Sequence, residues 1–514
     1  MRTKYVAAAV VATLAVAMPV PAAAASSTVV NPGFEADAGT ASPTGWSEAG
    51  TKSASFTEIG GRSGEFRLTH WSASAYRVET FQTLTGLRPG HYVLRAWVRS
   101  SGGQASATIG LRNCGGPPAT ATIGGTSTTT WVQIGVSAGV RGHRCTISLK
   151  SDAPAGEWIN FDDVTLARAD GSTIAIRGGD VSTLTKNEAF GGVYYTPSGR
   201  PGDALAILRS AGMNLTRLKV WVNPADGFNT KATVLRMAAR AKALGMKVLI
   251  DFHYSDTWAD PGHQTKPAAW SAYSVPELTD AIYAHTFDVL NALKQQGTPA
   301  DIVQLGNEIN GGMLWPDGDW NHWDNLAAFL IAGGAAAKAA SPSTRVMLHL
   351  GNGGDNGLYR WFFDNATTRG VPFDVIGASY YCYWHGSLES LQANLTDMAE
   401  RYGKDVLLTE TAYGFTTAES DFEANIFNPS LQQACGHPAT PRGQAEQLRS
   451  VFDVVRAVPG GHGLGVVYWE PAWTAVAGAG WDPANPASGD GWENQAMFDY
   501  ESRPLPVMRT LGHA

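Results

Sequence analysis

Eight short apolar stretches separated by helix-like segments constrain the fold of this chain more than any other feature. The apolar stretches cover residues 176–181, 215–221, 247–253, 302–307, 345–350, 375–380, 405–410 and 463–469. Helical patterns lie between them, including residues 233–244, 275–296, 323–340, 388–402 and 440–458. Strands that alternate with helices favour an α/β fold with a parallel sheet, and eight such units predict a closed (β/α)8 TIM barrel. The barrel is expected over residues 171–514. Its length of about 340 residues exceeds the roughly 250 typical of the fold, so the loops at its mouth must be long.

Residues 27–169 show a different pattern, in which short runs alternate apolar and polar side chains. The clearest runs are residues 92–98, 131–136, 145–149 and 159–166, separated by Gly, Pro, Ser and Thr. This spacing predicts an all-β antiparallel sandwich. The boundary with the barrel falls near residues 169–172, where no long Pro- or Ser-rich linker follows. The two domains are therefore expected to lie close together.

The N-terminus and the cysteines indicate an extracellular protein. Residues 1–25 have a basic start, an apolar Ala-rich run and a small-residue end, which predict a secretory signal peptide cleaved near Ala25. No later stretch is long enough to span a bilayer. The four cysteines contain no CxxC pair, which argues against a zinc site. We predict the disulfides Cys114–Cys145 and Cys382–Cys435, with two unpaired thiols as the alternative for the second pair.

Charge and composition narrow the class of partner. The net charge of -7 and the pI near 6.0 argue against nucleic acid or an anionic membrane. The chain has 17 tryptophans, whose faces suit stacking on sugar rings, although several must belong to the core. The composition therefore argues against these two classes of partner and is compatible with a carbohydrate ligand.

Polar and aromatic residues stand at the C-terminal ends of the predicted barrel strands. They are Arg217, Trp221, Asn223, His253, Tyr254, Asp256, Trp258, Asn307, Glu308, His349, Asp355, Tyr380, Trp384, His385, Glu410, Trp469, Glu470 and Trp473. Any one of them could be a core residue or a helix cap. Together they predict a site, because burying so many polar groups costs free energy unless they serve a function.

Glu308 and Glu410 follow the fourth and the seventh strands, so they are expected to face each other across the mouth. Two facing carboxyls fit glycosidic bond cleavage, with one protonated to donate to the leaving oxygen and the other ionised as nucleophile. A separation of about 5–5.5 Å would give retention of configuration. A helix N-cap is the alternative for Glu308 taken alone. Arg217 and the histidines are expected to keep the nucleophile ionised, and Asn307 to bind a substrate hydroxyl.

The sandwich resembles the carbohydrate-binding modules of secreted glycosidases. The resemblance rests on residues 31–35, 86–92 and 161–164, together with Trp46. It implies a structural calcium shared by Glu35 and Asp163. Trp71, Tyr76 and Arg112 are candidate ligand contacts, with ordinary surface or core positions as the alternative.

Six motifs stand out from residue 176 onward: residues 217–224, 251–264, 304–310, 379–381, 409–413 and 468–473. In these motifs the chain resembles the arabinogalactan endo-β-1,4-galactanases of glycoside hydrolase family fifty-three. The resemblance implies a retaining enzyme in which Glu308 is the acid/base and Glu410 the nucleophile. The implied substrate is β-1,4-galactan of the plant cell wall, including type I arabinogalactan, cut internally by a monomer without an organic cofactor. We expect the pKa of Glu308 to lie above that of Glu410.

The expected substrate contacts and calcium ligands complete this prediction. The contacts are Arg217, Trp221, Asn223, His253, Asp256, Trp258, Asn307, Trp315, His349, Tyr380, Trp384, His385 and Trp469. The resemblance also implies a calcium site formed by Glu419, Asp421, Glu423, Asn425, Ser488 and Asp490, with a solvated acidic loop as the alternative. This pattern departs from the family's usual Asp-and-His version. Cys382 replaces an expected proline, so its bridge to Cys435 would brace the same loop.

Two other functions stay open at this stage. One is a barrel glycosidase acting on another β-linked polysaccharide, such as mannan or glucan. The other is a carbohydrate-binding protein whose barrel no longer turns over, and the presence of both Glu308 and Glu410 argues against it.

Overall fold

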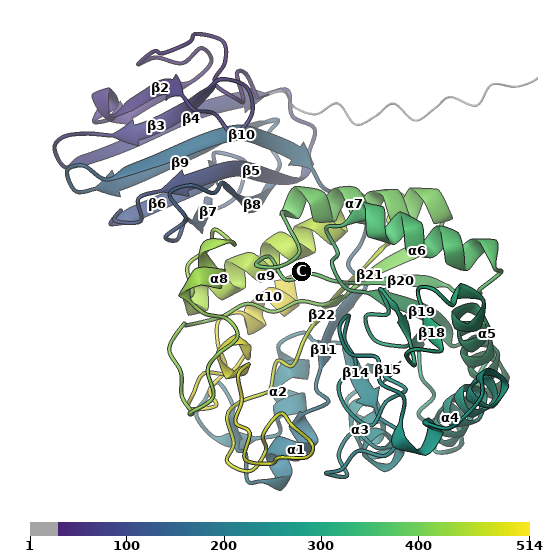
Figure 1. Ribbon diagram of the computed structural model, residues 1–514. Helices are drawn as coiled ribbons and strands as arrows, with labels where there is room; N and C mark the ends of the chain where they lie inside the picture. The colour runs from purple at the N-terminus through teal and green to yellow at the C-terminus, as the bar shows by residue number, and fades with distance from the viewer. Residues whose placement is uncertain (1–28, 514) are drawn as a thin grey trace, which may run out of the picture.

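The computed structural model describes residues 29–513, which form a β-sandwich and a (β/α)8 barrel packed side by side (Figure 1). The predicted signal peptide, residues 1–25, lies outside the described residues. Within the described part of the chain, no helix has the length and apolar character needed to cross a membrane.

The sandwich consists of two five-stranded antiparallel sheets, as the sequence predicts. One sheet has the order β1 (Ser47–Gly50), β4 (Tyr76–Thr85), β9 (Arg144–Ala153), β6 (Ser106–Arg112) and β7 (Ala119–Thr122). The other has the order β2 (Ser55–Ile59), β3 (Phe66–Trp71), β10 (Trp158–Arg168), β5 (Gly90–Ser100) and β8 (Val132–Val140). Alternate residues such as Leu94, Ile147 and Phe161 fill the space between the sheets. The predicted disulfide Cys114–Cys145 lies in this core.

The second domain is a closed barrel of eight parallel strands, which confirms the predicted fold. Its strands are β11 (Ile176–Asp180), β14 (Leu215–Val220), β15 (Lys247–Phe252), β16 (Ile302–Leu305), β19 (Arg345–Leu350), β20 (Val375–Ser379), β21 (Asp405–Glu410) and β22 (Gly463–Tyr468). Its helices are α1 (Leu184–Ala189), α2 (Ala204–Ser210), α3 (Lys231–Ala243), α4 (Val275–Gln295), α5 (Trp323–Ala340), α6 (Asn356–Thr368), α7 (Leu388–Tyr402), α8 (Pro429–Gln433), α9 (Pro441–Arg456) and α10 (Met508–His513). Two short ribbons, β12 (Tyr194–Tyr195) with β13 (Pro201–Gly202) and β17 (Gly312–Met313) with β18 (Gly318–Asp319), lie in the loops.

Local capping signals decide where the helices begin. The Thr230 side chain accepts a hydrogen bond from the Thr233 N–H, so α3 begins two residues before the predicted position. Ser274 and Glu277 form a capping box at the start of α4. Thr440 caps α9, and a proline occupies its first position.

The interior of the barrel changes from apolar to polar toward the mouth. Its apolar layer takes one residue from each strand: Ile176, Leu215, Leu249, Ile302, Met347, Val375, Leu407 and Val467. Side chains along a strand face the same side at every second position. Two residues further along, Leu215, Leu249, Ile302 and Met347 are therefore followed by Arg217, Asp251, Gln304 and His349. The same every-second-residue pattern that places apolar side chains in the core therefore places polar side chains at the mouth of the barrel.

The sandwich rests on the side of the barrel formed by α7 and α9 (Figure 1). His91 Nε2 lies 2.8 Å from Asp453 Oδ1 on α9. The Thr122 N–H donates to Glu446 at 2.9 Å, and the Gly124 N–H donates to the Gly436 carbonyl at 2.8 Å. The two domains are in direct contact, as the short junction predicts.

Candidate active site

Arg217 is the centre of a buried charge cluster at the mouth of the barrel. Its guanidinium lies 2.7 Å from Asp180, 2.9 Å from Asp251 and 2.8 Å from Glu410. Burial by itself would lower the pKa of Arg217. The three carboxylates raise it by more than burial lowers it, so the pKa of Arg217 lies above its usual value. The arginine is therefore permanently charged, and its planar fork fixes the positions of acids from three other strands.

Glu410 is the last residue of β21, and a neighbouring side chain contacts each of its two carboxylate oxygens. Arg217 Nη2 lies 2.8 Å from Oε1, and the Tyr381 hydroxyl donates to Oε2 at 3.2 Å. Glu410 as a whole residue is 5% exposed, so its charge depends on these two groups rather than on water. This environment suits an ionised nucleophile.

Asn307 and Glu308 lie in a tight turn that follows β16. Gly306 has a φ of +80°, and a Cβ at this position would lie 2.5 Å from the Ile309 side chain, so the turn requires glycine. Glu308 itself has a φ of 46°, an uncommon conformation for a residue with a side chain. Arg217 Nη2 donates to the side-chain oxygen Oδ1 of Asn307 at 2.7 Å, and the Asn307 side-chain amide donates to the Ala259 carbonyl at 2.8 Å. These bonds fix the turn that carries Glu308.

A hydrogen-bonded chain from His349 ends at the Glu308 carboxyl. Gln304 donates to His349 Nδ1 at 2.9 Å, which places the ring proton on Nε2. Nε2 then donates to Ser379 Oγ at 2.9 Å, and the Ser379 hydroxyl hydrogen bonds to Glu308. Gly351 lies against the same carboxyl, since a Cβ added there would be 3.0 Å from Glu308 Oε1.

Burial raises the pKa of both carboxyls, to about 7 for Glu308 and about 8 for Glu410. Arg217 lowers both values, and the charge of Glu308 raises the pKa of Glu410. This order is opposite to the sequence-based expectation. We assign the proton to Glu308 because Arg217 forms an ion pair with Glu410, whereas no ion pair to Glu308 occurs within residues 29–513. The two carboxyls therefore share one proton near neutral pH.

The histidines do not supply the positive charge that the sequence suggests. Burial lowers the pKa of His385 to about 4, and burial followed by the nearby Arg217 lowers that of His349 well below its usual value. Both rings are neutral at neutral pH. The expectation that these two histidines hold the nucleophile ionised by charge is wrong, and Arg217 takes that role.

An aromatic pocket extends the mouth to one side of the carboxyl pair. It is lined by Thr257, Trp258, Asp260, His263, Thr265, Glu423, Ala424, Ile426, Trp469, Trp473, Trp481, Gly491 and Trp492. Trp469 and Trp492 are in contact, with ring centroids 4.5 Å apart, and Trp492 contacts Tyr381 at 5.6 Å. Lys219 Nζ lies 3.7 Å above the Trp258 ring. The pocket therefore adjoins Glu410 and offers flat aromatic faces on which sugar rings can stack.

Sequence reasoning placed Trp258 and Trp469 in the site but missed four residues of its surroundings. Trp481 and Trp492 come from the long loop after β22, which has no periodic pattern; their residue type was the only signal. Lys219 and Tyr381 lie within motifs that carry the family resemblance, residues 217–224 and 379–381, but neither was predicted to be a site residue. Predicted contacts Trp221 and His253 do approach Trp258, with ring centroids 5.4 and 6.5 Å from it.

Several predicted contacts have other roles. Tyr380 is only 1% exposed and donates to the Gly386 carbonyl, so it is not available to substrate; Tyr381 faces the site instead. Asp256 accepts from the backbone N–H groups of Asn223 and Ala268, which makes it a loop brace. Asn223 is exposed.

Two further predicted contacts are tryptophans in the mouth loops. Trp315 is partly buried and donates to the Gly311 carbonyl at 3.0 Å. Trp384 is 50% exposed, so its indole is open to a ligand.

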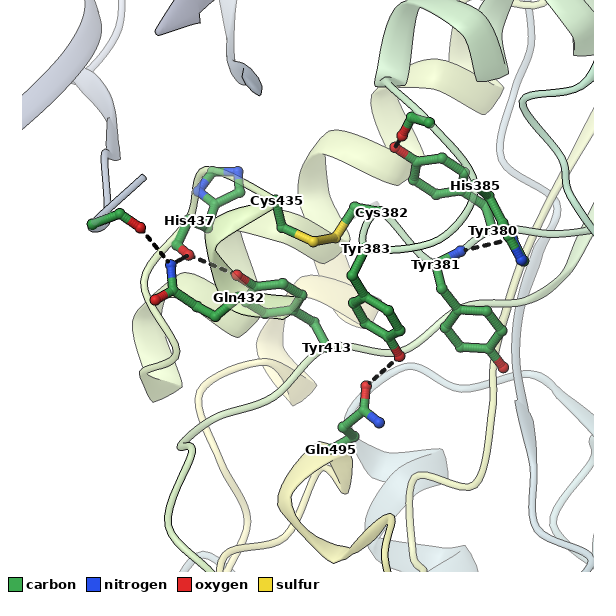
Figure 2. Close-up of a disulfide and its surroundings, with 12 residues drawn as sticks. Tyr380, Tyr381, Cys382, Tyr383, His385, Tyr413, Gln432, Cys435, His437 and Gln495 are labelled. Carbon is green, nitrogen blue, oxygen red and sulfur yellow. Dashed lines mark hydrogen bonds between the residues drawn. A yellow bond between two sulfur atoms is a disulfide. The ribbon is translucent and has the colours of Figure 1, made fainter. Parts of the chain in front are cut away.

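The predicted Cys382–Cys435 disulfide is formed, and it ties the loop after β20 to the loop after α8. Figure 2 shows Tyr380 and Tyr381 pointing to opposite sides of the chain beside this bridge. On the far side, the Tyr413 hydroxyl and the Gln432 amide both donate to the His437 carbonyl. The bridge therefore fixes the residue next to Tyr381 against a segment that also contacts the sandwich.

The two loops of the predicted barrel calcium site lie together. The Asp490 N–H donates to Asp421 Oδ2, and the Ile426 N–H donates to the Gly491 carbonyl, both at 2.8 Å. Asp490 Oδ2 and Asn425 Oδ1 are buried oxygens that find no hydrogen-bond partner among residues 29–513. Burial, and then Glu493 and Asp421, raise the pKa of Asp490 well above its usual value. Orphaned oxygens on acidic and amide side chains fit a calcium ion.

The other predicted metal ligands give less support. Glu419 is exposed, and Ser488 Oγ accepts from the Asp482 N–H at 3.0 Å. In the sandwich, Arg62 lies 2.7 Å from Asp163 Oδ2, and Glu35 accepts from two backbone N–H groups. Across residues 29–513, no group of three or more His, Cys, Asp or Glu side chains is arranged to hold a metal. The sandwich calcium stays a prediction from the resemblance alone.

The family model of Glycosyl hydrolase family 53 matches residues 176–511, which is the whole barrel. This chain belongs to glycosyl hydrolase family 53. An endo-β-1,4-galactanase of Bacillus subtilis is 33% identical over 373 residues, covering 66% of this chain and 86% of the relative. An arabinogalactan endo-β-1,4-galactanase of Thermothelomyces thermophilus is 36% identical over 317 residues, covering 60% and 92%.

Among solved structures, the family 53 catalytic domain of Ignisphaera aggregans is 38% identical, with a TM-score of 0.63, and covers 66% of this chain and 95% of that one. Membership of family 53 makes the barrel a glycoside hydrolase. The carboxyl pair at its mouth is the group that this chemistry requires.

Proposed function

We propose that this chain is a secreted endo-β-1,4-galactanase that cleaves internal bonds of galactan with retention of configuration. The observation that carries the proposal is the unequal environment of two carboxyls at one mouth. Glu410 is paired with Arg217, whereas Glu308 is half-buried and, within residues 29–513, has the Ser379 hydroxyl as its hydrogen-bond donor and no ion-pair partner. The two relatives are endo-β-1,4-galactanases, which supports β-1,4-galactan as the polysaccharide.

In the first step, a Glu410 oxygen attacks the anomeric carbon and the bond to the glycosidic oxygen breaks. Glu308 gives its proton to that oxygen, so the aglycone leaves as an alcohol and a glycosyl ester forms on Glu410. In the second step, the Glu308 carboxylate takes a proton from water, the water oxygen attacks the anomeric carbon, and the ester bond to Glu410 breaks. Both glutamates return to their starting protonation states.

The residues around the pair serve this exchange of charge. Arg217 and Tyr381 hold Glu410 ionised before attack and receive its charge again when the ester breaks. Ser379 orients Glu308 between its acid and base forms. The aromatic pocket beside them supports a chain that extends beyond the cleaved bond.

We further propose a structural calcium ion in the loops after β21 and β22. Asp421, Asn425 and Asp490 would hold it, with Glu419, Glu423 and Ser488 as the remaining predicted ligands. Such an ion would neutralise buried carboxylate charge and fix the loops that carry Trp481 and Trp492.

Secretion and a monomeric state belong to the same proposal. The sequence of residues 1–25 and the two disulfides support an extracellular protein. One chain carries both carboxyls and the pocket, so a single copy is sufficient for activity.

The test is release of reducing sugar from galactan, mannan and β-glucan by the full-length protein. We expect activity on galactan, and loss of that activity by about 10²-fold or more in Glu308→Gln and in Glu410→Gln. NMR of the first product should show the β anomer. Equal activity on mannan or glucan would contradict the substrate, and full activity of either variant would contradict the site.

A further inference from the structure

A buried lysine lies beyond Arg217 in the interior of the barrel, on the side of the mouth. Lys219 follows Arg217 by two residues on β14, so both side chains point to the inside of the barrel. Lys219 is 2% exposed, and its Nζ lies 3.2 Å from Oε1 of the fully buried Glu470. The Glu470 carboxylate also accepts hydrogen bonds from the N–H and the hydroxyl of Thr183. Glu470 is therefore fixed in place, and it fixes the ammonium of Lys219.

The ammonium of Lys219 lies against one face of the Trp258 indole. Nζ is 3.7 Å from the centroid of this ring and 5.6 Å from that of Trp221. Among residues 29–513, Glu470 is the only hydrogen-bond acceptor of Nζ, so the indoles supply the rest of its stabilisation. A cation that is shielded from water interacts strongly with the face of a tryptophan. The Lys219–Trp258 contact therefore belongs to the strong class of cation–π interactions.

The main chain and the indole N–H of Trp258 are fixed by hydrogen bonds. Trp258 Nε1 donates to the Trp481 carbonyl at 2.9 Å. The N–H of the next residue, Ala259, donates to His253 Nδ1 at 3.1 Å, and its carbonyl accepts from the Asn307 side-chain amide at 2.8 Å. With these two points held, the remaining freedom of the rigid indole is the tilt of its plane about the line that joins them.

Lys219 is the group that sets this tilt. The neighbouring rings contact Trp258 in several orientations: Trp473 is nearly parallel to it at 5.8 Å, and Trp221 is almost perpendicular at 5.4 Å. Aromatic pairs tolerate a range of such arrangements, whereas a cation is attracted to the centre of the ring face. The ammonium also occupies one face of Trp258, so a sugar ring can stack only on the other. The partly exposed Trp258 lines the aromatic pocket beside the carboxyl pair.

We propose that Lys219, with Glu470 as its counter-ion, is a positioning residue that holds the Trp258 indole at the tilt on which a galactan ring stacks. Lys219 acts through Trp258, because its own burial keeps it from the sugar. A buried ion pair can often be replaced by apolar side chains without loss of stability, so stability alone does not account for this one. Because Trp258 is assigned to substrate, this role rests on the galactanase function proposed for the barrel.

The proposal separates substrate binding from the chemical step. Trp258 would hold the sugar equally in the ground state and in the transition state, so its misplacement should raise KM and leave kcat nearly unchanged. The charge of Lys219 is paired with Glu470, whereas that of Glu410 is paired with Arg217. Removing the Lys219–Glu470 pair should therefore leave both limbs of the pH–rate profile in place.

The test replaces both members of the pair, Lys219→Met with Glu470→Gln, in the full-length protein, so that no buried carboxylate is left without its counter-ion. KM for soluble galactan should rise by about tenfold, with kcat within about twofold of the wild type. Lys219→Arg keeps a cation that can stack on the indole, and its KM should stay within about threefold of the wild-type value. The matched control is Lys242→Met, which removes an ion pair of 2.7 Å with Asp301 before the start of β16 and should leave KM unchanged.

A double-mutant cycle with Trp258→Ala shows whether Lys219 acts through this ring. In the Trp258→Ala background, the paired substitution of Lys219 and Glu470 should change KM by less than about twofold. A tenfold rise in that background would show that Lys219 acts independently of Trp258 and would overturn the proposal. An unchanged KM in the paired variant, or equal KM values for Lys219→Arg and the paired variant, would also overturn it.

Near-UV circular dichroism without sugar gives a readout that does not depend on catalysis. The signal of the Trp258–Trp473 pair should change in the paired variant and stay as in the wild type in Lys242→Met. Thermal unfolding of each variant shows that the fold is kept. An unchanged spectrum in the folded paired variant would refute the positioning role. If the wild-type chain fails to cleave galactan but the paired variant shows a change in the spectrum that Trp258→Ala abolishes, the galactanase proposal fails and the positioning of Trp258 stands.

Discussion

Replacing Tyr381 with phenylalanine removes the hydroxyl that donates to Glu410 at 3.2 Å and keeps the ring. A hydrogen bond to a charged group contributes about 1.5–3 kcal/mol, and this long one belongs at the lower end. Since about 1.4 kcal/mol corresponds to one pKa unit, the pKa of the Glu410 carboxyl should rise by about one unit. The bond stabilises the ionised form, so its loss makes Glu410 easier to protonate.

The pH dependence of kcat/KM on a soluble galactooligosaccharide measures this change. Activity of the free enzyme requires an ionised Glu410, so the acid limb should move upward by about one pH unit. On that limb, the variant should be about tenfold slower than the wild type at equal pH. Near the optimum the difference should be smaller, because Arg217 still holds the charge of Glu410.

Tyr380→Phe is the matched control in the neighbouring position. It removes a buried hydroxyl that donates to the Gly386 carbonyl at 2.9 Å and contacts neither glutamate. It should lower the free energy of unfolding by about 1 kcal/mol and leave both limbs in place. An unmoved acid limb in Tyr381→Phe, or an equal shift in Tyr380→Phe, would refute the assignment of Glu410 as the ionised nucleophile.

Three further outcomes follow from the same structure. Ser379→Ala removes a hydrogen bond that lowers the pKa of Glu308, so the alkaline limb of the pH–rate profile should move upward; a downward shift would contradict the role. The double substitution Cys382→Ser and Cys435→Ser opens a 53-residue loop and should reduce the free energy of unfolding by about 4 kcal/mol. It should also lower kcat, whereas removal of the sandwich disulfide should leave kcat unchanged. EDTA should lower Tm. The increase in Tm on adding calcium should become larger as the pH rises through the raised pKa of Asp490. If calcium raises the Tm of an Asp490→Asn variant as much as that of the wild type, this site is excluded.

The barrel and the two glutamates at its mouth were predictable because their signals are periodic and local. Alternation along β14 puts Arg217 two residues beyond Leu215, and a buried strand that ends in Asn307 and Glu308 marks the mouth. The direction of a side chain outside the strands is not periodic. Tyr380 and Tyr381 are neighbours in sequence, yet the Tyr380 side chain is buried in the core and the Tyr381 hydroxyl reaches Glu410.

The charge states of the histidines also depended on burial that no motif records. His349 and His385 looked like cations beside a carboxylate, and burial makes both neutral.

Burial and pairing also separate the three ligand contacts suggested for the sandwich. Tyr76 is 3% exposed and donates to the His70 carbonyl, so it is a core residue rather than a ligand contact. Arg112 lies 3.2 Å from Glu79, so its charge is already paired. Trp71 is 42% exposed and stays a prediction.

By itself, the sequence determined the two fold classes, the eight strands and the positions of the two glutamates, because strand period and strand-end polarity are properties of short segments. It predicted both disulfides but left the pairing of Cys382 with Cys435 open, and the structure decided it. The tertiary structure decided which groups surround those glutamates, which carboxyl pairs with Arg217, and which indole the buried Lys219 covers. These features depend on distances between segments far apart in the chain, and such distances are fixed only when the sheets close and the two domains dock.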